Sequence, residues 1–372
     1  MKHLSEGVLE ETRCSPSTCP TSSPAYFPIS VVVPVHNGGE NFRHCLASLT
    51  ATVPPPEEII VVADGDTDGS WQLAKEFGAQ VLRIPGPGGP ARARNLGART
   101  AHGDILFFVD ADVIVPPDAL RQIVEAFAQK PDLAAVFGSY DDTPAASNFL
   151  SQYKNLFHHY VHQTACEDAS TFWGACGAIR REVFLALGGF DEQYRYPSIE
   201  DIEFGFRLKQ ASGKILLRKA LQVKHLKRWG VASLLKADIF HRALPWTELI
   251  MRERHLPNDL NLRLSSRVSI ALTYGLLLTV LGSWWWPRLL VVAGVMAFSL
   301  LLLNTQVYGF FWRKRGLRFT VQVVPWHWLY YFYSGLAFAI GSASFLLRRG
   351  SLVKTSAVTV PEEQPPSGRV AE

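Results

Sequence analysis

Three long apolar runs near the C-terminus constrain this 372-residue chain more than any other feature. Residues 268–286, 289–312 and 328–347 carry no charged side chain. About 20 helical residues cross a hydrocarbon core of about 30 Å, so each run is long enough to span a membrane. The alternative, buried core helices of a soluble protein, is disfavoured because three such runs follow one another. We expect a helical hairpin from the first two runs, joined by Pro287 and Arg288.

The residues that flank these runs predict how they are oriented. The tryptophans at 284–286 suit the membrane interface at the tip of the hairpin, and Asn304 is expected to face another helix. Basic residues at 313–318 place the loop after the second run, and with it the N-terminal domain, in the cytoplasm. A third crossing would leave Arg348 and Arg349 outside. Basic residues are preferred on the cytoplasmic side, so a full crossing by the third run would go against this preference. The run could instead be re-entrant or buried among partners. We favour a full crossing.

The rest of the chain divides by composition into four further segments. Residues 1–27 are rich in Ser, Thr and Pro, lack the apolar run of a signal peptide, and predict a flexible leader. Residues 28–227 form an α/β domain, and residues 228–266 predict basic amphipathic helices at the membrane surface, or ordinary solvent-facing helices. Residues 267–349 form the anchor, and residues 350–372 predict a disordered tail.

The N-terminal domain alternates buried strands with helices. Apolar β-branched runs at 29–35, 58–63, 80–84 and 104–109 are separated by helical patterns at 40–49, 68–77 and 91–100, the second with Asp68 as N-cap. Such alternation predicts a mostly parallel, Rossmann-like sheet, whose ligands bind beyond the carboxyl ends of the strands. Polar residues follow three of these strands and should converge on one crevice. They are His36 and Asn37, Asp64 and Asp66, and Asp110 and Asp112.

Asp110 and Asp112 are the strongest candidates for metal chemistry. Two carboxylates one residue apart at a strand end can share Mg²⁺ or Mn²⁺, and such an ion also binds substrate phosphates. The alternative is a pair of turn or capping aspartates before Pro116 and Pro117.

Several other classes of protein are disfavoured. A net charge of +4 gives no reason to propose a nucleic-acid partner. The five cysteines lack zinc-type spacing and suit free thiols in a reducing compartment. The loop from Asp64 to Gly69 resembles a calcium loop, but Lys75 stands where its glutamate would be required. Neither a dinucleotide fingerprint nor a phosphate-binding GxxxxGK[ST] loop occurs.

Six motifs, in order between residues 30 and 212, resemble the family 2 inverting glycosyltransferases with the GT-A fold. They are SVVVPVHNGGENFRHCLASL, EIIVVADGDTDGS, GGPARARNLGA, GDILFFVDADVIVPPDAL, FWGACGAIRREVFLALGGFDE and SIEDIEFGFRLKQAS. The resemblance implies an α/β GT-A domain that binds a nucleotide-sugar. Family members often carry an acidic residue at the position of Ala63 and a serine at that of Asp66, so the base of the donor stays open.

The resemblance also implies roles for individual residues. Asp112, with Asp110, would bind the metal ion, and Asp201, beside Glu200, would be the general base that deprotonates the acceptor. Acidic residues favoured at a helix N-terminus are the structural alternative for Glu200 and Asp201. The residues expected to hold the nucleotide are Pro34, Asn37, Asp64, Asp66, Arg94, Asn95 and Asp110.

The acceptor side is less sharply defined. Trp173 and Gly174 would face the sugar or the acceptor, although Trp173 could be a core residue. His225, Arg228 and Trp229 resemble the QxxRW element of polysaccharide-polymerising relatives, with His225 in place of Gln. His225 could instead complete the metal or diphosphate site, and a surface basic patch near lipid headgroups is the structural alternative.

These features together predict a metal-dependent inverting glycosyltransferase of the hexosyltransferase type. It would move a sugar from a UDP- or GDP-sugar to a hydroxyl or phosphate of a lipid or lipid-linked acceptor, at the cytoplasmic face of a bacterial inner membrane. A processive polysaccharide synthase is one alternative, disfavoured because no apolar span precedes Ser30. An inactive membrane scaffold that keeps the fold is the other.

Overall fold

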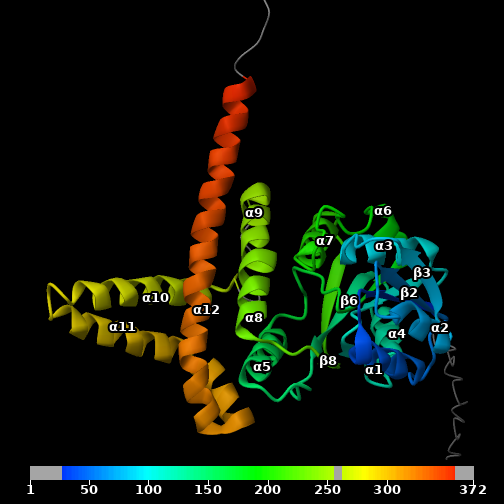
Figure 1. Cartoon of the computed structure of the whole chain (residues 1–372), viewed down its shortest axis with the longest axis horizontal. Helices are drawn as coiled ribbons and strands as arrows, with labels where there is room; N and C mark the ends of the chain where they lie inside the picture. Colours follow the sequence, from blue (N-terminus) through cyan, green and yellow to red (C-terminus); the bar gives the residue numbers. More distant parts are fainter. Residues whose placement is uncertain (1–26, 255–261, 357–372) are drawn as a thin grey trace, which may run out of the picture.

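The computed structural model describes residues 27–254 and 262–356. An α/β domain lies at one end of the molecule, and long apolar helices lie at the other (Figure 1). The leader expected at residues 1–27 and most of the tail expected at residues 350–372 fall outside the described residues.

One sheet organises the domain, and its strand order is β3-β2-β1-β4-β7-β6-β8-β5. β1 to β4 are mutually parallel, β7 runs antiparallel between β4 and β6, and β5 pairs antiparallel with the end of β8. The mostly parallel α/β sheet is therefore confirmed, with one reversed strand at its centre. The strands are β1 (Ile29–Val35), β2 (Glu58–Asp64), β3 (Gln80–Ile84), β4 (Ile105–Val109), β5 (Val113–Ile114), β6 (Leu133–Tyr140), β7 (Cys176–Arg180) and β8 (Lys214–His225).

Helices cover both faces of the sheet, so its strands are buried on two sides. In β1, Val31 packs into the core cluster that contains Phe42 of α1, whereas Val32 packs into the opposite cluster with Ala93 of α3. This two-sided burial explains why the strands are continuous apolar runs. The helices of the domain are α1 (Gly39–Thr50), α2 (Ser70–Glu76), α3 (Pro90–Thr100), α4 (Ala119–Gln129), α5 (Phe149–Thr164), α6 (Arg181–Ala186) and α7 (Glu200–Gln210).

The expected N-cap of the second helix is wrong by one residue. α2 is capped by Gly69, whose φ of 86° suits glycine, and Asp68 precedes it. The Asp68 carboxylate still accepts a hydrogen bond from the Ser70 backbone N–H at 3.0 Å, and it also accepts one from the Gly39 N–H at 2.9 Å. Asp68 therefore joins the loops that follow β1 and β2.

A bent helical segment connects the domain to the apolar helices. It consists of α8 (Val231–Asp238), a π-helical turn η1 (Ile239–Ala243) and α9 (Leu244–Glu253). Leu234 and Leu249 are buried, whereas Phe240 is exposed. Figure 1 shows this segment between the domain and the long helix α12. One apolar side of the segment thus packs against protein, and its contact with a membrane surface stays a prediction.

Two apolar helices form the expected hairpin, α10 (Leu264–Gly282) and α11 (Leu289–Leu303). The three tryptophans at its tip are 69–87% exposed. Among the described residues, two helical segments are long and apolar enough to cross a membrane, Leu264–Gly282 and Thr305–Arg348, whereas α11 is shorter. The second predicted run is divided, because α11 ends at Asn304. The Asn304 side chain donates to Ser269 of α10 at 3.1 Å and accepts from Tyr331 at 2.7 Å, which confirms that it faces other helices.

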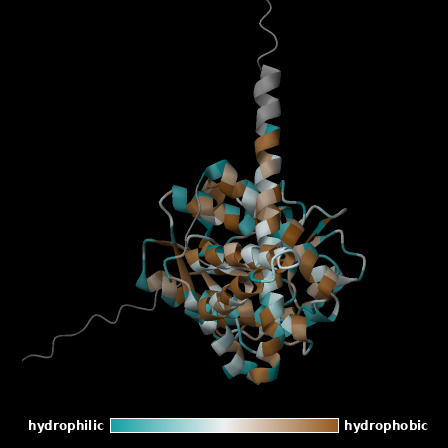
Figure 2. Cartoon of the chain, turned by 90° about the vertical axis from the view of Figure 1, so that its left-hand side faces the viewer, coloured by the Kyte–Doolittle hydropathy of each residue, from teal (hydrophilic) through white to brown (hydrophobic). Residues whose placement is uncertain are grey.

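The last helix, α12 (Thr305–Ser356), is broken at Gly316, whose φ is 78°. It continues beyond residue 349, where the anchor was expected to end. The hairpin projects crosswise to the long part of α12 (Figure 1), and hydrophobic residues line the part of α12 that rises above the domain (Figure 2). The basic segment near the break is helical and docks on the domain, since Lys314 pairs with Asp142 and Arg315 donates to Gln152 at 2.8 Å.

Candidate active site

Arg94 of α3 draws two of the expected acidic residues together. Its guanidinium donates to Asp110 Oδ1 at 2.6 Å and to Glu200 Oε1 at 2.8 Å, and the side chain is only 6% exposed. Asp110 follows β4, whereas Glu200 begins α7, so the contact joins elements that lie about 90 residues apart (200 − 110). The remaining Glu200 oxygen accepts from the Ser198 N–H at 2.9 Å. These charge-assisted hydrogen bonds fix the geometry of the carboxylates, whereas Arg94 Nε is buried without a partner among the described residues.

Asp201 lies beside this cluster and lines a cavity. Its Oδ2 accepts from the Gly174 N–H at 2.9 Å, and its Oδ1 accepts from the Ile202 N–H at 2.8 Å. An added Cβ at Gly174 would lie 3.3 Å from Arg94 Cζ and 3.5 Å from Asp201 Cβ, so this glycine fits between the two side chains. Burial and the neighbouring charge of Glu200 raise the pKa of Asp201 to about 7. A carboxylate with that pKa suits a general base near neutral pH.

Asp112 faces His225 on the other side of the crevice. The antiparallel pairing of β5 with β8 sets Val113 opposite His225, which leaves His225 Nε2 3.4 Å from Asp112 Oδ2. The ring of His225 stacks on Tyr140 at 4.4 Å, and its Nδ1 donates to Asn155 Oδ1 at 2.8 Å. The bond to Asn155 fixes the ring orientation so that Nε2 faces Asp112.

The donor set fits a divalent cation that also binds a diphosphate. Asp110, Asp112, Glu200 and Asp201 supply four carboxyl groups to this crevice, whereas Arg94 supplies one fixed positive charge. In the described part of the chain, no three His, Cys, Asp or Glu side chains are close enough to hold an ion alone. Mg²⁺ and Mn²⁺ are commonly held by one or two carboxylates, with phosphate oxygens and water completing the shell.

The loops after β1 and β2 form a second, donor-side group. Asp64 is buried, and its two oxygens accept from the N–H groups of Gly88 and Gly89 at 2.7 and 2.8 Å, which ties β2 to the loop after β3. Asn37 accepts from the Thr67 N–H at 2.7 Å and is exposed.

Three other residues expected on the donor side are also placed by backbone or side-chain contacts. Asp66 caps the start of α2 by accepting from the Trp71 N–H at 3.2 Å. The Nδ1–H of His36 donates to the carbonyl of Asp64 at 2.7 Å. Pro34 lies near the end of β1, opposite Val62. The structure thus brings the predicted donor-side residues to one edge of the sheet.

Asn95 stands apart from this group. Its side chain is 3% exposed, donates to the carbonyl of Phe190 at 2.8 Å and accepts from the N–H of the same residue at 2.8 Å. A further bond from its amide reaches Glu192 at 3.0 Å. Asn95 therefore holds the Gly-rich turn before α7, and it does not face the crevice from which a nucleotide would be held.

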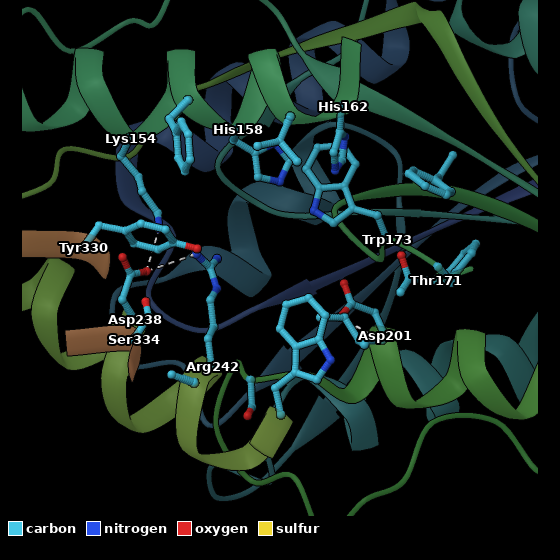
Figure 3. Close-up of a pocket in the computed structure, with 18 residues that line it drawn as sticks. Lys154, His158, His162, Thr171, Trp173, Asp201, Asp238, Arg242, Tyr330 and Ser334 are labelled. Atoms are coloured by element: carbon cyan, nitrogen blue, oxygen red, sulfur yellow. Dashed lines mark hydrogen bonds and ion pairs between the residues drawn. The ribbon is translucent and has the colours of Figure 1, made fainter. Parts of the chain in front are cut away.

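The expected acceptor-side residues divide into two groups. Trp173 lines a cavity of about 170 Å³ together with Asp201 and lies near His158 (Figure 3). Its ring also contacts that of Tyr140. Trp229 is 4% exposed and belongs to a small core with Leu150 and Leu234, so it does not reach the cavity. Arg228 is exposed.

The same cavity contains residues that no motif predicted. Lys154, Asp238 and Arg242 line it and form an ion-paired cluster (Figure 3). They come from α5, α8 and the π-helical turn. The three residues are far apart in the sequence, so no motif reveals that they form a cluster. The sequence signal for Asp238 and Arg242 was their place in the predicted amphipathic helices at 228–266.

Comparison with known proteins identifies the domain. Residues 30–188 match the model of glycosyl transferase family 2. This segment is a family 2 glycosyltransferase domain. The match includes Asp64, Arg94, Asp110 and Asp112, and it ends before Asp201.

Individual relatives support the same placement. The chain is 34% identical over 143 residues to glycosyltransferase GlyG of Streptococcus pneumoniae, which is 37% of this chain and 45% of the relative. It is 22% identical over 206 residues to a glucosyl-dolichyl phosphate glucuronosyltransferase of Haloferax volcanii, which is 50% of this chain and 64% of the relative. The chain thus spans less than two thirds of each relative.

A solved structure extends the likeness to most of the chain. The mannosyltransferase PcManGT of Pyrobaculum calidifontis, solved with GDP-Man and Mn²⁺, has a TM-score of 0.52 at 17% identity and covers 87% of this chain and 88% of its own. At that identity the likeness establishes the fold. The expected GT-A fold is therefore confirmed.

Proposed function

We propose that this chain is a metal-dependent inverting glycosyltransferase that moves a sugar from a UDP- or GDP-sugar to a hydroxyl of a membrane lipid. The observation that carries the proposal is the gathering of Asp110, Glu200 and Asp201 around Arg94, with Asp112 next to them at His225. The family 2 domain supplies the reaction class. The solved structure of PcManGT, which shares the fold, contains GDP-Man and Mn²⁺.

Donor binding is assigned to the edge of the sheet beyond β1, β2 and β4. Pro34, Asn37, Asp64 and Asp66 would surround the base and ribose, and Asp112 with His225 would hold the ion. When bound, the ion supplies positive charge that offsets the charge developing on the diphosphate leaving group.

Asp201 takes the proton of the acceptor hydroxyl as its oxygen forms the new bond to the anomeric carbon. The bond from that carbon to the diphosphate oxygen breaks, and its electron pair leaves with the nucleoside diphosphate. The products are the glycosylated lipid, the nucleoside diphosphate and one proton on Asp201. Attack opposite to the leaving group inverts the anomeric configuration.

The helices support a membrane location for the acceptor. Exposed apolar side chains on α10 and α11, such as Leu278 and Val291, need a non-aqueous environment. Lys314 and Arg315 dock on the domain, so the basic residues and the active site share one side of the membrane. Basic flanks favour the cytoplasm, and we therefore assign catalysis to that side of the membrane.

The test is to incubate the purified, detergent-solubilised full chain with a panel of nucleotide-sugars, a membrane lipid extract and Mn²⁺, and to identify products by mass spectrometry. We expect one sugar added to a lipid, with inverted configuration by NMR, and loss of transfer on addition of EDTA. A ladder of long glycans would instead identify a processive synthase. No binding of any nucleotide-sugar in calorimetry would identify an inactive scaffold.

A further inference from the structure

Two cavities meet beside the proposed catalytic base. The cavity that contains Asp201 has a volume of about 170 Å³, and the adjoining groove between α9, α10 and α12 has a volume of about 610 Å³. They share four lining residues, so they lie side by side. The shared residues are Ala243, Trp246, Tyr330 and Ser334. The groove is mostly apolar, with Ile250, Ile270 and Phe338 among its lining.

A cationic cluster lines the smaller cavity, and its Arg242 is followed by Ala243, which lines both cavities. Asp238 accepts from Lys154 Nζ at 2.6 Å and from the Tyr333 hydroxyl at 2.7 Å, and its Oδ1 lies 3.5 Å from Arg242. Two cations thus share one carboxylate, which leaves one positive charge unbalanced within the cluster. The Arg242 side chain is 44% exposed and retains donors for a ligand.

The backbone explains why Arg242 points into this cavity. It lies in the π-helical turn between α8 and α9, which inserts an extra residue into the helix and changes the direction of the side chains that follow. Such turns occur frequently at functional sites.

The cavity also contains His158, which has a buried ring nitrogen without a hydrogen-bond partner among the described residues. This nitrogen is Nδ1, and His158 lines the cavity near Trp173 (Figure 3). Burial lowers the pKa of His158 well below its usual value, so its ring is neutral and can exchange hydrogen bonds with hydroxyl groups. An unpaired buried polar atom in a cavity is expensive unless a ligand or water satisfies it.

We propose that the acceptor is a phosphate-containing lipid whose hydrocarbon chain lies in the groove between α9, α10 and α12. Arg242 binds its phosphate, and a hydroxyl of its headgroup reaches Asp201. Figure 3 shows Tyr330 and Ser334 on one side of the cavity, Asp201 and Trp173 on the other, and Arg242 between them, which matches this order of lipid parts. The inference rests on the proposed function and names its acceptor class.

The experiment uses the full chain in phosphatidylcholine nanodiscs and hexadecyl phosphate with a diazirine at the end of its chain. After irradiation, we expect cross-links on peptides that contain Ile250, Ile270 or Phe338. Unlabelled hexadecyl phosphate should compete about tenfold better than hexadecanol, which is the scale of one hydrogen bond to a charged group. Butyl phosphate, which lacks the long chain, should not compete.

Matched variants separate the groove from the outer surface. Ala339 is exposed and lines the groove, so Ala339→Trp should fill it and reduce cross-linking about tenfold. Leu278→Trp adds the same ring on the outward face of α10 and should have no effect. Arg242→Ala should abolish the preference for the phosphate over hexadecanol, and Arg242→Lys should restore part of it.

Two results would overturn the inference. One is cross-linking spread over the outward faces of α10 and α12 and unchanged by Ala339→Trp. The other is equal competition by hexadecanol and hexadecyl phosphate. Asp201→Asn separates this failure from failure of the proposed function, because the variant should keep full cross-linking and lose transfer. If the wild-type chain showed full cross-linking but transferred no sugar, the proposed lipid site would stand and the proposed glycosyltransferase activity would be rejected.

Discussion

At the scale of residues, Glu200 and Asp201 are adjacent in sequence but have different partners. The Glu200 carboxylate is paired with the Arg94 guanidinium at 2.8 Å, but Arg94 also pairs with Asp110, so one positive charge is shared by two carboxylates. Asp201 accepts only backbone N–H groups from Gly174 and Ile202. The neutral partners leave Asp201 as the carboxylate that can gain a proton, whereas Glu200 raises its proton affinity through charge repulsion.

The rate of transfer should therefore depend on the ionisation of Asp201. Below its pKa of about 7 the carboxyl is protonated and cannot accept a proton, so kcat/KM should rise with pH through that value and then level off. Glu200→Gln removes the repelling charge and should move this rise to lower pH. Measurement of kcat/KM from pH 5 to 9 for both proteins tests this. An unchanged or upward-shifted rise in Glu200→Gln would contradict the account.

Asn95 tests a case in which sequence and structure suggest different roles. The resemblance placed it at the nucleotide, whereas the structure gives its side chain bonds to Phe190 and Glu192. Asn95→Ala leaves the Phe190 groups unpaired, so thermal unfolding should show a loss of about 2 kcal/mol. The exposed amide Gln129→Ala is the control. Near-normal stability with greatly weakened nucleotide binding would support the role that the resemblance implied.

At the scale of elements, the strands of the first half were predictable almost to the residue. β1 and β3 match their predicted ranges at both ends. β1 is buried on both faces and leaves an unbroken hydrophobic run, whereas β3 is an edge strand in which Gln80 and Arg83 are exposed. The reversed β7 and the two-residue β5 were not predicted, since their pairing depends on distant partners. β5 matters because it sets His225 against Asp112.

The sequence predicted that the C-terminal helices would be apolar, but it did not predict the break between α11 and α12. Asn304 ends α11 and bonds to both Ser269 and Tyr331, which splits a run that hydropathy treats as continuous. The break between the two helices thus depends on one polar residue, whose role becomes visible only when its hydrogen-bond partners in the structure are known.

Asn304→Leu should weaken the packing of the hairpin against α12. The variant loses the hydrogen bonds to Ser269 and Tyr331, each worth about 0.6–2 kcal/mol within a membrane. We expect a melting temperature several degrees lower in detergent, measured by intrinsic tryptophan fluorescence. Ser299→Leu on α11 is the control, because Ser299 bonds only within its own helix. Equal melting temperatures for the two variants would contradict the bridging role.

At the scale of the whole molecule, the sequence predicted that polar residues after separate strands would meet in one crevice, because parallel strands end on one side. The structure brings Asp110, Glu200 and Asp201 together around Arg94, but of these three only Asp110 follows a strand. The cluster of Lys154, Asp238 and Arg242 was not predictable, because it requires α5 to meet α8 and the π-helical turn, which lie far away in the sequence. The crosswise direction of α12 was likewise hidden.

The arrangement in the membrane gives a prediction for chemical labelling. The native Cys166 is exposed on the domain, and Arg288→Cys would place a thiol at the tip of the hairpin. In whole cells with Cys14 and Cys19 replaced by Ser, an impermeant maleimide should label the tip and spare Cys166. Permeabilised cells should show both labels. Labelling of both sites in intact cells would contradict a hairpin that crosses the membrane from a cytoplasmic domain.

The most direct test of the central claim is the transfer rate of Asp201→Asn, measured with its affinity for the donor. The asparagine keeps the size of the side chain but cannot accept the acceptor proton. We predict a rate at least about 100-fold lower, as for loss of a general base. Nucleotide-sugar affinity in calorimetry should be unchanged, and the surface control Asp132→Asn should be fully active. A fully active Asp201→Asn enzyme would contradict the assignment of the base and the site built around it.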